Sequence, residues 1–234
     1  MIKLGILKTD ALKPEFVEEF GEYPDMFARS FTAVDAQLEL VTYDVQLGQY
    51  PSSIDEVDAY LITGSKSSVY DPEPWIDTLK AFVRELDQAK KKLVGICFGH
   101  QLIADALGGK TEKAEQGWCV GLQRAQLHPA AQHYGIDAES FGIISSHQDQ
   151  VTALSPGAQV LASTEGCPVH AMGIGDHILT FQGHPEFVPV FMQKVLDMRR
   201  DILGEANYQQ ATASLQITTD RLSVIRWIAH FIGA

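Results

Sequence analysis

Short apolar runs alternate with longer amphipathic segments over roughly the first hundred residues of the chain. Four of the runs have the length and composition of buried strands: residues 3–7, 38–43, 59–63 and 93–96. Residues 25–36 and 75–91 lie between them and carry apolar side chains at helical spacing. Strands that alternate with helices are typical of parallel βαβ units. The pattern therefore predicts an α/β fold with an open, mostly parallel, twisted sheet and flanking helices.

The pattern changes after Gly109, where short strand-like runs follow one another with turn residues between them. They leave no room for crossover helices: residues 120–127, 141–145, 160–163, 169–174 and 177–181. Parallel strands need long crossover connections, whereas antiparallel strands can be joined by short turns. We therefore predict a small antiparallel excursion that returns to the main sheet.

Segments near both ends of the chain fall outside this sheet. Residues 189–203 and 218–232 are amphipathic enough to form surface helices, and a polar stretch around residues 205–214 joins them. Near the N-terminus, residues 10–24 contain prolines, a glycine and several acidic side chains, and we expect a loop or a short helix there. The length suits a single domain over residues 1–234, with its C-terminal helices starting at about residue 189.

Composition narrows the classes of function. The 18 Lys and Arg residues are outnumbered by 30 Asp and Glu residues, which gives a formal net charge of −12. An acidic chain repels phosphate backbones and anionic lipids, so we expect no nucleic-acid and no membrane binding. The N-terminus lacks the pattern of a signal peptide. Three widely spaced cysteines, Cys97, Cys119 and Cys167, suit a reducing compartment, and we expect a cytoplasmic protein.

One cysteine occupies a special position in the pattern. The strand-like run at residues 93–96 ends on Cys97, and a helical pattern follows over residues 101–107. Gly95 and Gly99 flank the cysteine at the spacing of a nucleophile elbow, a tight turn in which glycines remove Cβ atoms that would clash. The helix N-terminus just after the thiol favours its thiolate form. A buried structural cysteine is the alternative that this pattern leaves open.

A nucleophilic thiolate needs a base and a group that orients the base. Both residue types occur in His184-Pro185-Glu186, which follows a strand-like run. The carboxyl ends of parallel strands lie at the same edge of a sheet, so we expect His184 on the same side as Cys97. Pro185 restricts the backbone and places Glu186 within reach of the imidazole. An exposed loop histidine is the alternative.

Acyl transfer also needs hydrogen-bond donors that face the developing oxyanion. The elbow would present the amide of Phe98. A second donor could come from the glycine-containing turn at residues 62–67, which is otherwise only a connecting loop. None of the eight histidines belongs to a His-Glu-x-x-His pair. We therefore predict no metal ion and no other cofactor.

Taken together, these motifs resemble the class I glutamine amidotransferases, the triad type related to the glutaminase domain of GMP synthase. The resemblance rests on the elbow at residues 95–101, on His184-Pro185-Glu186 downstream and on the Gly64-Ser65 turn upstream. It spans roughly residues 4–186. The family fold is a flavodoxin-like, open α/β sheet with flanking helices, in agreement with the pattern of strands and helices described above.

The resemblance implies a mechanism. Cys97 would attack the γ-carboxamide of glutamine, His184 would pass a proton to the leaving ammonia, and Glu186 would orient His184. Water would then release glutamate from the γ-glutamyl thioester. The backbone amides of Phe98 and Ser65 would form the oxyanion hole.

The resemblance also implies substrate-binding residues. Gln101 matches the family position that holds the substrate glutamine. Residues 146–149 resemble the family's Ser-His-x-Asp segment, which contacts the α-amino and α-carboxylate groups; a polar turn is the alternative for this segment. The predicted substrate-binding residues are Gln101, Gly64, Ser67, Ser146, His147 and Gln148.

The chain departs from the family pattern in several places. Biosynthetic relatives usually carry Gly-Gly-Pro where this chain has Gly64-Ser65-Lys66, and Gln148 occupies a position that is often glycine. The sequence ends about fifty residues after Glu186 and contains no Walker-type glycine loop. We therefore expect any synthetase that uses the ammonia to be a separate partner protein.

Two functions fit these motifs. The first is a glutamine amidotransferase or glutaminase subunit that releases ammonia for a partner synthetase. The second is a stand-alone γ-glutamyl peptidase or hydrolase with the same triad; the N-terminal insertion and the Gly-Ser turn resemble those of stand-alone members of that kind. A binding module that has lost catalysis is a third possibility, and the presence of Cys97, His184 and Glu186 argues against it.

Overall fold

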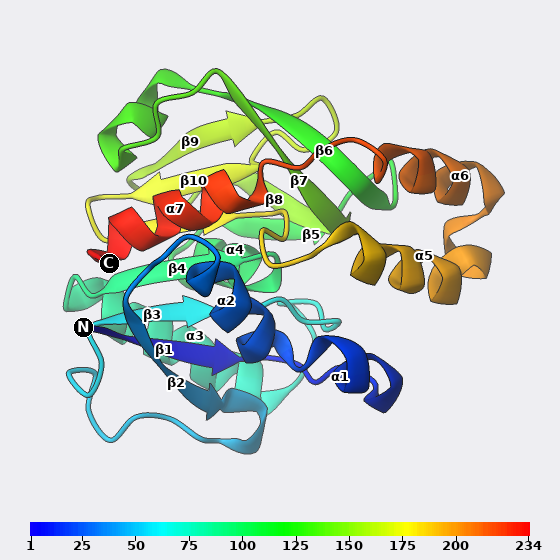
Figure 1. The fold of residues 1–234 in the computed structure, drawn as a ribbon. Coiled ribbons are helices and arrows are strands. Elements are labelled where there is room, and N and C mark those ends of the chain that lie inside the picture. Colours follow the sequence, from blue (N-terminus) through cyan, green and yellow to red (C-terminus); the bar gives the residue numbers. More distant parts are fainter.

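A nine-stranded sheet forms the centre of the computed structural model, which describes residues 1–234 (Figure 1). Its strands lie in the order β2-β1-β3-β4-β11-β10-β9-β6-β7. The first five strands in this order are parallel, and the antiparallel part begins where β10 pairs with β11. The nine strands are β1 (Ile2–Lys8), β2 (Leu38–Asp44), β3 (Ala59–Ile62), β4 (Lys92–Ile96), β6 (Cys119–Leu127), β7 (Ser140–His147), β9 (Ala158–Ser163), β10 (Ala171–Ile174) and β11 (Ile178–Phe181).

Two further strands form a small antiparallel sheet, β5 (Lys110–Lys113) and β8 (Asp149–Ala153). The α-helices are α1 (Pro14–Phe20), α2 (Tyr23–Thr32), α3 (Pro74–Gln88), α4 (Phe98–Ala106), α5 (Pro189–Leu203), α6 (Glu205–Ser214) and α7 (Arg221–Ile232). The 3-10 helices are η1 (Val45–Leu47) and η2 (Pro129–Tyr134). None of the helices has both the length and the apolar composition that crossing a membrane requires.

Each face of the main sheet has its own hydrophobic core. Helices α2 and α7 pack on one face, where Phe27 is fully buried. Helices α3 and α4 pack on the other, where Leu79 is fully buried. Successive strand residues point to opposite faces, so Leu61 of β3 joins the first core and Ile62 joins the second. Both faces of the parallel strands are therefore covered, which explains their nearly continuous apolar sequence.

A third core lies beyond the carboxyl ends of the parallel strands. Figure 1 places α1, α5 and α6 there, past the arrowheads of β1 and β3. The ring of Phe191 on α5 meets the rings of Phe16 and Phe20 on α1 edge-on, with centroids 5.8 and 5.2 Å apart. The N-terminal insertion and the C-terminal helices, far apart in sequence, therefore pack together above this edge of the sheet.

The α/β fold class is confirmed, and α5 begins at Pro189, where the C-terminal helices were expected. The antiparallel part is larger than the excursion that we expected and belongs to the main sheet. Strands β5 and β8 were not predicted. The stretch around residues 205–214 is helix α6 and not only a polar connection. Ala211 is its one buried residue, so the sequence carries little of the apolar periodicity that would indicate a helix.

The junction of β4 and α4 is tightly packed against β3. A Cβ atom added to Gly99 would lie 2.5 Å from the carbonyl oxygen of Ile62, a separation that real Cβ atoms essentially never show. The helix can start this close to the sheet only because position 99 has no side chain.

We predict that Gly99→Ala lowers the free energy of unfolding by about 1–3 kcal/mol, because the new methyl group forces α4 away from β3. Urea denaturation followed by circular dichroism would measure the change. Gly166→Ala is the matched control, since its Cβ would have no neighbour nearer than 3.9 Å. Equal stability of the two variants would contradict the packing argument.

Candidate active site

Cys97 lies in the turn between β4 and α4, in a backbone conformation that residues other than glycine rarely adopt. Its φ is 53° and its ψ is −101°. Such a conformation is strained and persists only where the surrounding structure imposes it. At Cys97 the close packing of the strand against the helix imposes this conformation. A Cβ atom on Gly95, in the strand, would lie 2.7 Å from the carbonyl oxygen of Gly99, in the helix. The turn therefore has the geometry of a nucleophile elbow and places the cysteine at the carboxyl edge of the sheet.

His184 reaches the same edge from the neighbouring strand. β11 runs parallel to β4, with Phe181 opposite Ile96, and the amide of Cys97 donates a hydrogen bond to the carbonyl oxygen of Phe181 at 2.9 Å. Three residues further on, the amide of His184 donates to the carbonyl oxygen of Ile144 at 2.7 Å. These backbone bonds bring the imidazole and the thiol together from segments almost ninety residues apart in sequence.

A buried carboxylate controls the protonation of His184. Nδ1 of the imidazole lies 2.8 Å from Oε1 of Glu186, and the side chains are only 5% and 0% exposed. Burial by itself disfavours the imidazolium, but attraction to Glu186, followed by Cys97, outweighs burial and raises the pKa of His184 to about 10. His184 therefore carries a proton at neutral pH and can give it to a leaving group.

Aromatic rings hold the imidazole from one side. The ring of Phe187 stacks on His184 with a centroid distance of 4.0 Å and an interplanar angle of 3°. Tyr23 of α2 stacks in turn on Phe187, at 6.4 Å and 24°. A ring face attracts a cation, so this column both stabilises the imidazolium and fixes the plane of its ring.

Two backbone amides near Cys97 lack an acceptor within the chain. Phe98 is the first residue of α4, so its amide has no intrahelical partner. The amide of Ser65 makes no backbone hydrogen bond, and Ser65 lines the same cavities as Cys97. Both amides are therefore free to donate to an oxyanion next to the thiol.

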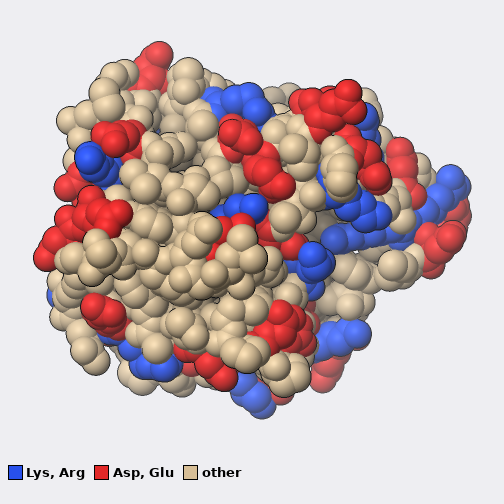
Figure 2. All heavy atoms as spheres, turned by 90° about the horizontal axis from the view of Figure 1, so that it is seen from below, with Lys and Arg blue, Asp and Glu red and all other residues tan.

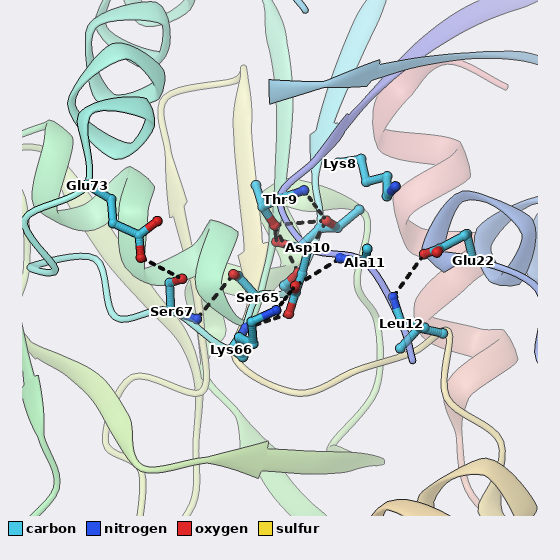
Figure 3. Close-up of polar contacts among 12 residues, drawn as sticks. Lys8, Thr9, Asp10, Ala11, Leu12, Glu22, Ser65, Lys66, Ser67 and Glu73 are labelled. Carbon is cyan, nitrogen blue, oxygen red and sulfur yellow. Dashed lines mark hydrogen bonds and ion pairs between the residues drawn. The ribbon is translucent and has the colours of Figure 1, made fainter. Parts of the chain in front are cut away.

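The turn that carries Ser65 is tied to the end of β1, as Figure 3 shows. The carboxylate of Asp10 accepts a hydrogen bond from the amide of Lys66 at 3.0 Å and pairs with the Lys66 Nζ at 2.8 Å. The hydroxyl of Thr9 lies 2.9 Å from the carbonyl oxygen of Gly64. The Asp10 side chain is 6% exposed, so this ion pair has one well-shielded partner and fixes the turn in place.

Gln101 extends from the first turn of α4 toward the end of β11. Its Nε2 donates to the carbonyl oxygen of Asp149 at 2.7 Å and to Oε1 of Gln182 at 3.1 Å. Nε2 of Gln182 in turn lies 3.7 Å from the sulfur of Cys97. The side-chain nitrogen of Gln101 thus links Gln182, which lies beside Cys97, to the backbone of β8. The side-chain oxygen of Gln101, Oε1, accepts no hydrogen bond from the chain.

A small polar cavity of about 120 Å³ opens on one side of Cys97. Its lining contains Gln101 and all but one of the other predicted substrate-binding residues, namely Ser67, Ser146, His147 and Gln148. Burial lowers the pKa of His147 to about 4, so this side chain is neutral at physiological pH. The remaining predicted residue, Gly64, lies behind the triad: a Cβ atom there would be 2.8 Å from Cε1 of His184.

A larger and mainly apolar cavity of about 350 Å³ opens on the other side of Cys97. His184 and Ser65 line it together with side chains of α1, α2 and α5. The two cavities share Ser65, Lys66, Cys97, Ser146 and Arg199. A molecule with a polar half and an apolar half could therefore lie across the thiol.

Sequence reasoning missed several residues that shape the site. Asp10 follows the end of a parallel strand, the position where functional side chains gather in α/β sheets, so that signal was available. Gln182 and Phe187 lie within two residues of the His184-Pro185-Glu186 motif, but no pattern in the sequence shows that Gln182 approaches Cys97 or that Phe187 stacks on His184. Arg199 lies on α5 and had no local signal. No group of three or more His, Cys, Asp or Glu residues is arranged to hold a metal ion.

We predict that iodoacetamide alkylates Cys97 faster than the other two cysteines near neutral pH. Burial raises the pKa of Cys119 to about 11 and that of Cys167 to about 12, whereas Cys97 has the helix N-terminus and a protonated His184 beside it. Mass spectrometry of peptides sampled over time would give the three rates. Equal rates in the folded protein would contradict the prediction.

We predict that Glu186→Gln lowers the pKa of His184 by about 1–3 units, because the carboxylate that favours the imidazolium is removed. The imidazole would then lose its proton at lower pH than in the unmodified protein. NMR titration of the ring protons would measure both values. An unchanged titration of His184 would show that Glu186 does not control it.

Comparison with known proteins identifies relatives of this chain. The model of the family "Glutamine amidotransferase class-I" matches residues 16–197. Gamma-glutamyl peptidase 3 of Arabidopsis thaliana is 36% identical over 192 residues, which cover 78% of this chain and 76% of that protein. A glutamine-hydrolyzing GMP synthase of Thermomicrobium roseum is 32% identical over 169 residues, 71% of this chain and 30% of that enzyme.

Among solved structures, a glutamine amidotransferase from Thermotoga maritima superimposes with a TM-score of 0.79 and covers 100% of this chain and 99% of that one. Its sequence identity is 14%, so this likeness concerns the fold alone. The family match spans most of the chain, including the elbow and the His184 motif. The protein therefore belongs to the class I glutamine amidotransferase family, whose members are enzymes with a cysteine nucleophile.

Proposed function

We propose that the protein hydrolyses γ-glutamyl amide bonds, with Cys97 as the nucleophile, His184 as the general acid and base, and Glu186 as the group that orients His184. The support is geometric. The thiol is presented by a strained elbow, the imidazole is protonated and buried beside it, and the carboxylate lies 2.8 Å from the ring nitrogen. This is the arrangement that nucleophilic acyl transfer by a cysteine requires.

The reaction has two steps. The Cys97 thiolate attacks the γ-carbonyl carbon, and the oxyanion accepts hydrogen bonds from the amides of Phe98 and Ser65. The carbon–nitrogen bond breaks as His184 gives its proton to the leaving amine, which leaves a γ-glutamyl thioester. His184 then takes a proton from water, the resulting hydroxide attacks the thioester carbon, and the carbon–sulfur bond breaks to release glutamate and the thiolate.

The pair of cavities that meet at Cys97 is the observation that carries this proposal. The polar cavity suits the γ-glutamyl group, because Gln101, Ser67, Ser146, His147 and Gln148 offer donors and acceptors for its α-amino and α-carboxylate groups. The apolar cavity then holds the leaving group, the amine that is released from the γ-glutamyl amide.

The size of the apolar cavity favours a γ-glutamyl peptidase or hydrolase. Ammonia needs about as much space as one water molecule, roughly 30 Å³, whereas the cavity measures about 350 Å³. Such a volume is in the range of pockets that bind small organic molecules. The name of the Arabidopsis relative, a gamma-glutamyl peptidase, agrees with this choice.

Ammonia supply to a partner synthetase is the second candidate. The Thermomicrobium relative is a GMP synthase, of which this chain covers only 30%. In this candidate glutamine would be the substrate, and a synthetase would receive the ammonia. In either case we propose a reducing, cytoplasmic setting, since all three cysteines are free thiols.

We predict that the purified protein alone releases glutamate from γ-glutamyl dipeptides, and that Cys97→Ala abolishes this activity. Cys119→Ala is the matched control and should retain it, because Cys119 lines neither cavity at the triad. Glutamate and the amine product can be measured by chromatography. Full activity of Cys97→Ala would refute the thioester mechanism, and turnover of glutamine only in the presence of an added synthetase would favour the second candidate.

A further inference from the structure

Two short segments that flank the part of the chain matched by the family model contribute to the walls of the apolar cavity. That match covers residues 16–197. Before it, residues 10–13 line the cavity, and after it Met198 and Arg199 do so. The triad and the aromatic lining of the cavity thus lie within the matched part of the chain, while Lys13 and Met198 lie just outside it.

Aromatic and aliphatic side chains form the floor and sides of the cavity. Phe16, Tyr23, Phe187, Phe191 and Val195 all line it, and all are buried. Phe16 and Phe191 pack edge-on, with centroids 5.8 Å apart. A bulky apolar group in this space would exchange water for ring surface, at about 25 cal/mol per Å² of apolar area buried.

Positive charge surrounds the same cavity. Lys13, Lys66 and Arg199 line it, against the single acidic residue Asp10. Asp10 is paired with Lys66, whereas Lys13 and Arg199 form no salt bridge with any carboxylate of the chain. Figure 2 shows Lys and Arg atoms gathered between the body of the molecule and the lobe projecting at the right, the side that carries α1, α5 and α6 in Figure 1.

This arrangement is unexpected in a chain with a net charge of −12. The two unpaired cations occupy different positions around the site. Arg199 donates a hydrogen bond to Ser146 at 3.0 Å, packs over the ring of Trp118 and lines both cavities. Lys13 is exposed and lines only the apolar cavity. Lys13 is therefore the unpaired cation that belongs to the apolar cavity alone, where a carboxylate on the leaving group would meet it.

We propose that the apolar cavity is a leaving-group subsite for an amino acid with a bulky apolar side chain and a free carboxylate. Its amine is the nitrogen acylated by the γ-glutamyl group, its side chain lies among Phe16, Phe191 and Val195, and its carboxylate faces Lys13. This inference rests on the proposed hydrolysis of γ-glutamyl amides and names the class of amine that leaves.

Four substrates separate the contribution of the aromatic ring on the leaving amine from that of its carboxylate. γ-Glutamyl-phenylalanine carries both the ring and the carboxylate, γ-glutamyl-phenethylamine carries only the ring, γ-glutamyl-glycine carries only the carboxylate, and glutamine carries neither. We expect kcat/KM for γ-glutamyl-phenylalanine to exceed that for γ-glutamyl-glycine by at least about tenfold. We also expect it to exceed that for γ-glutamyl-phenethylamine by about fivefold, the effect of one exposed ion pair.

Two pairs of variants locate these effects. Lys13→Gln should bring kcat/KM for γ-glutamyl-phenylalanine down to that for γ-glutamyl-phenethylamine, whereas Lys3→Gln, outside the cavity, should leave the ratio unchanged. Met198 lines the cavity and is 41% exposed. Met198→Glu should lower the preference for phenylalanine over glycine about tenfold, because it replaces an apolar lining side chain with a charged one. Ile202→Glu, one turn further along α5 and 70% exposed, makes the same change outside the cavity and should have no effect.

The outcomes distinguish this inference from the proposed function. Hydrolysis of all four substrates at similar rates, dependent on Cys97, would overturn the leaving-group subsite and leave the γ-glutamyl hydrolase intact. Equal effects of Met198→Glu and Ile202→Glu would also overturn it. Failure to hydrolyse any γ-glutamyl compound would overturn the proposed function and the inference together.

Discussion

The close approach of strand β4 to helix α4 is the constraint on which the site depends. The helix starts so near the sheet that a methyl group on Gly99 would lie 2.5 Å from a backbone oxygen of β3. The single residue that joins strand to helix must therefore turn sharply, and Cys97 takes a left-handed conformation to do so. Strain at this residue is held by the packing of two cores, since β4 contributes side chains to both.

The same packing determines the electrostatics of the site. Because β11 lies beside β4, the imidazole of His184 is buried next to the thiol, and burial without a partner would keep it neutral. The carboxylate of Glu186, with Oε1 2.8 Å from Nδ1 of His184, instead favours the imidazolium. The stacked ring of Phe187 stabilises the imidazolium further. The protonated base thus depends on both levels of structure: the local sequence supplies Glu186 and Phe187, and the pairing of β11 with β4 buries the group beside the thiol.

The site combines residues from two parts of the fold. The triad, the oxyanion amides and the polar cavity lie at the carboxyl edge of the parallel strands, as ligand sites in open α/β sheets generally do. The apolar cavity is completed by α1 and α5, which pack on each other in the third core. Two members of this core, Tyr23 and Phe187, also form the column of rings beside His184, so the third core connects the apolar cavity to the triad.

Much of the fold could be predicted from the sequence by itself. Apolar runs and glycine spacing indicated the parallel strands, the elbow at Cys97 and the order of the motifs, because local periodicity and turn chemistry are properties of short segments. The helix at residues 205–214 could not be predicted in this way, since only Ala211 on it is buried.

The tertiary structure decided which side chains meet. The chain provides His184 and Glu186 as neighbours, but the parallel pairing of β11 with β4 brings them to Cys97. No local pattern marks Asp10 as the partner of Lys66 or Arg199 as part of both cavities, because these contacts join segments separated by more than fifty residues. Sequence thus determined the chemical groups and the local turn that presents the thiol. The shape and charge of the space beside the thiol depend on packing between distant helices, and only the folded structure contains that information.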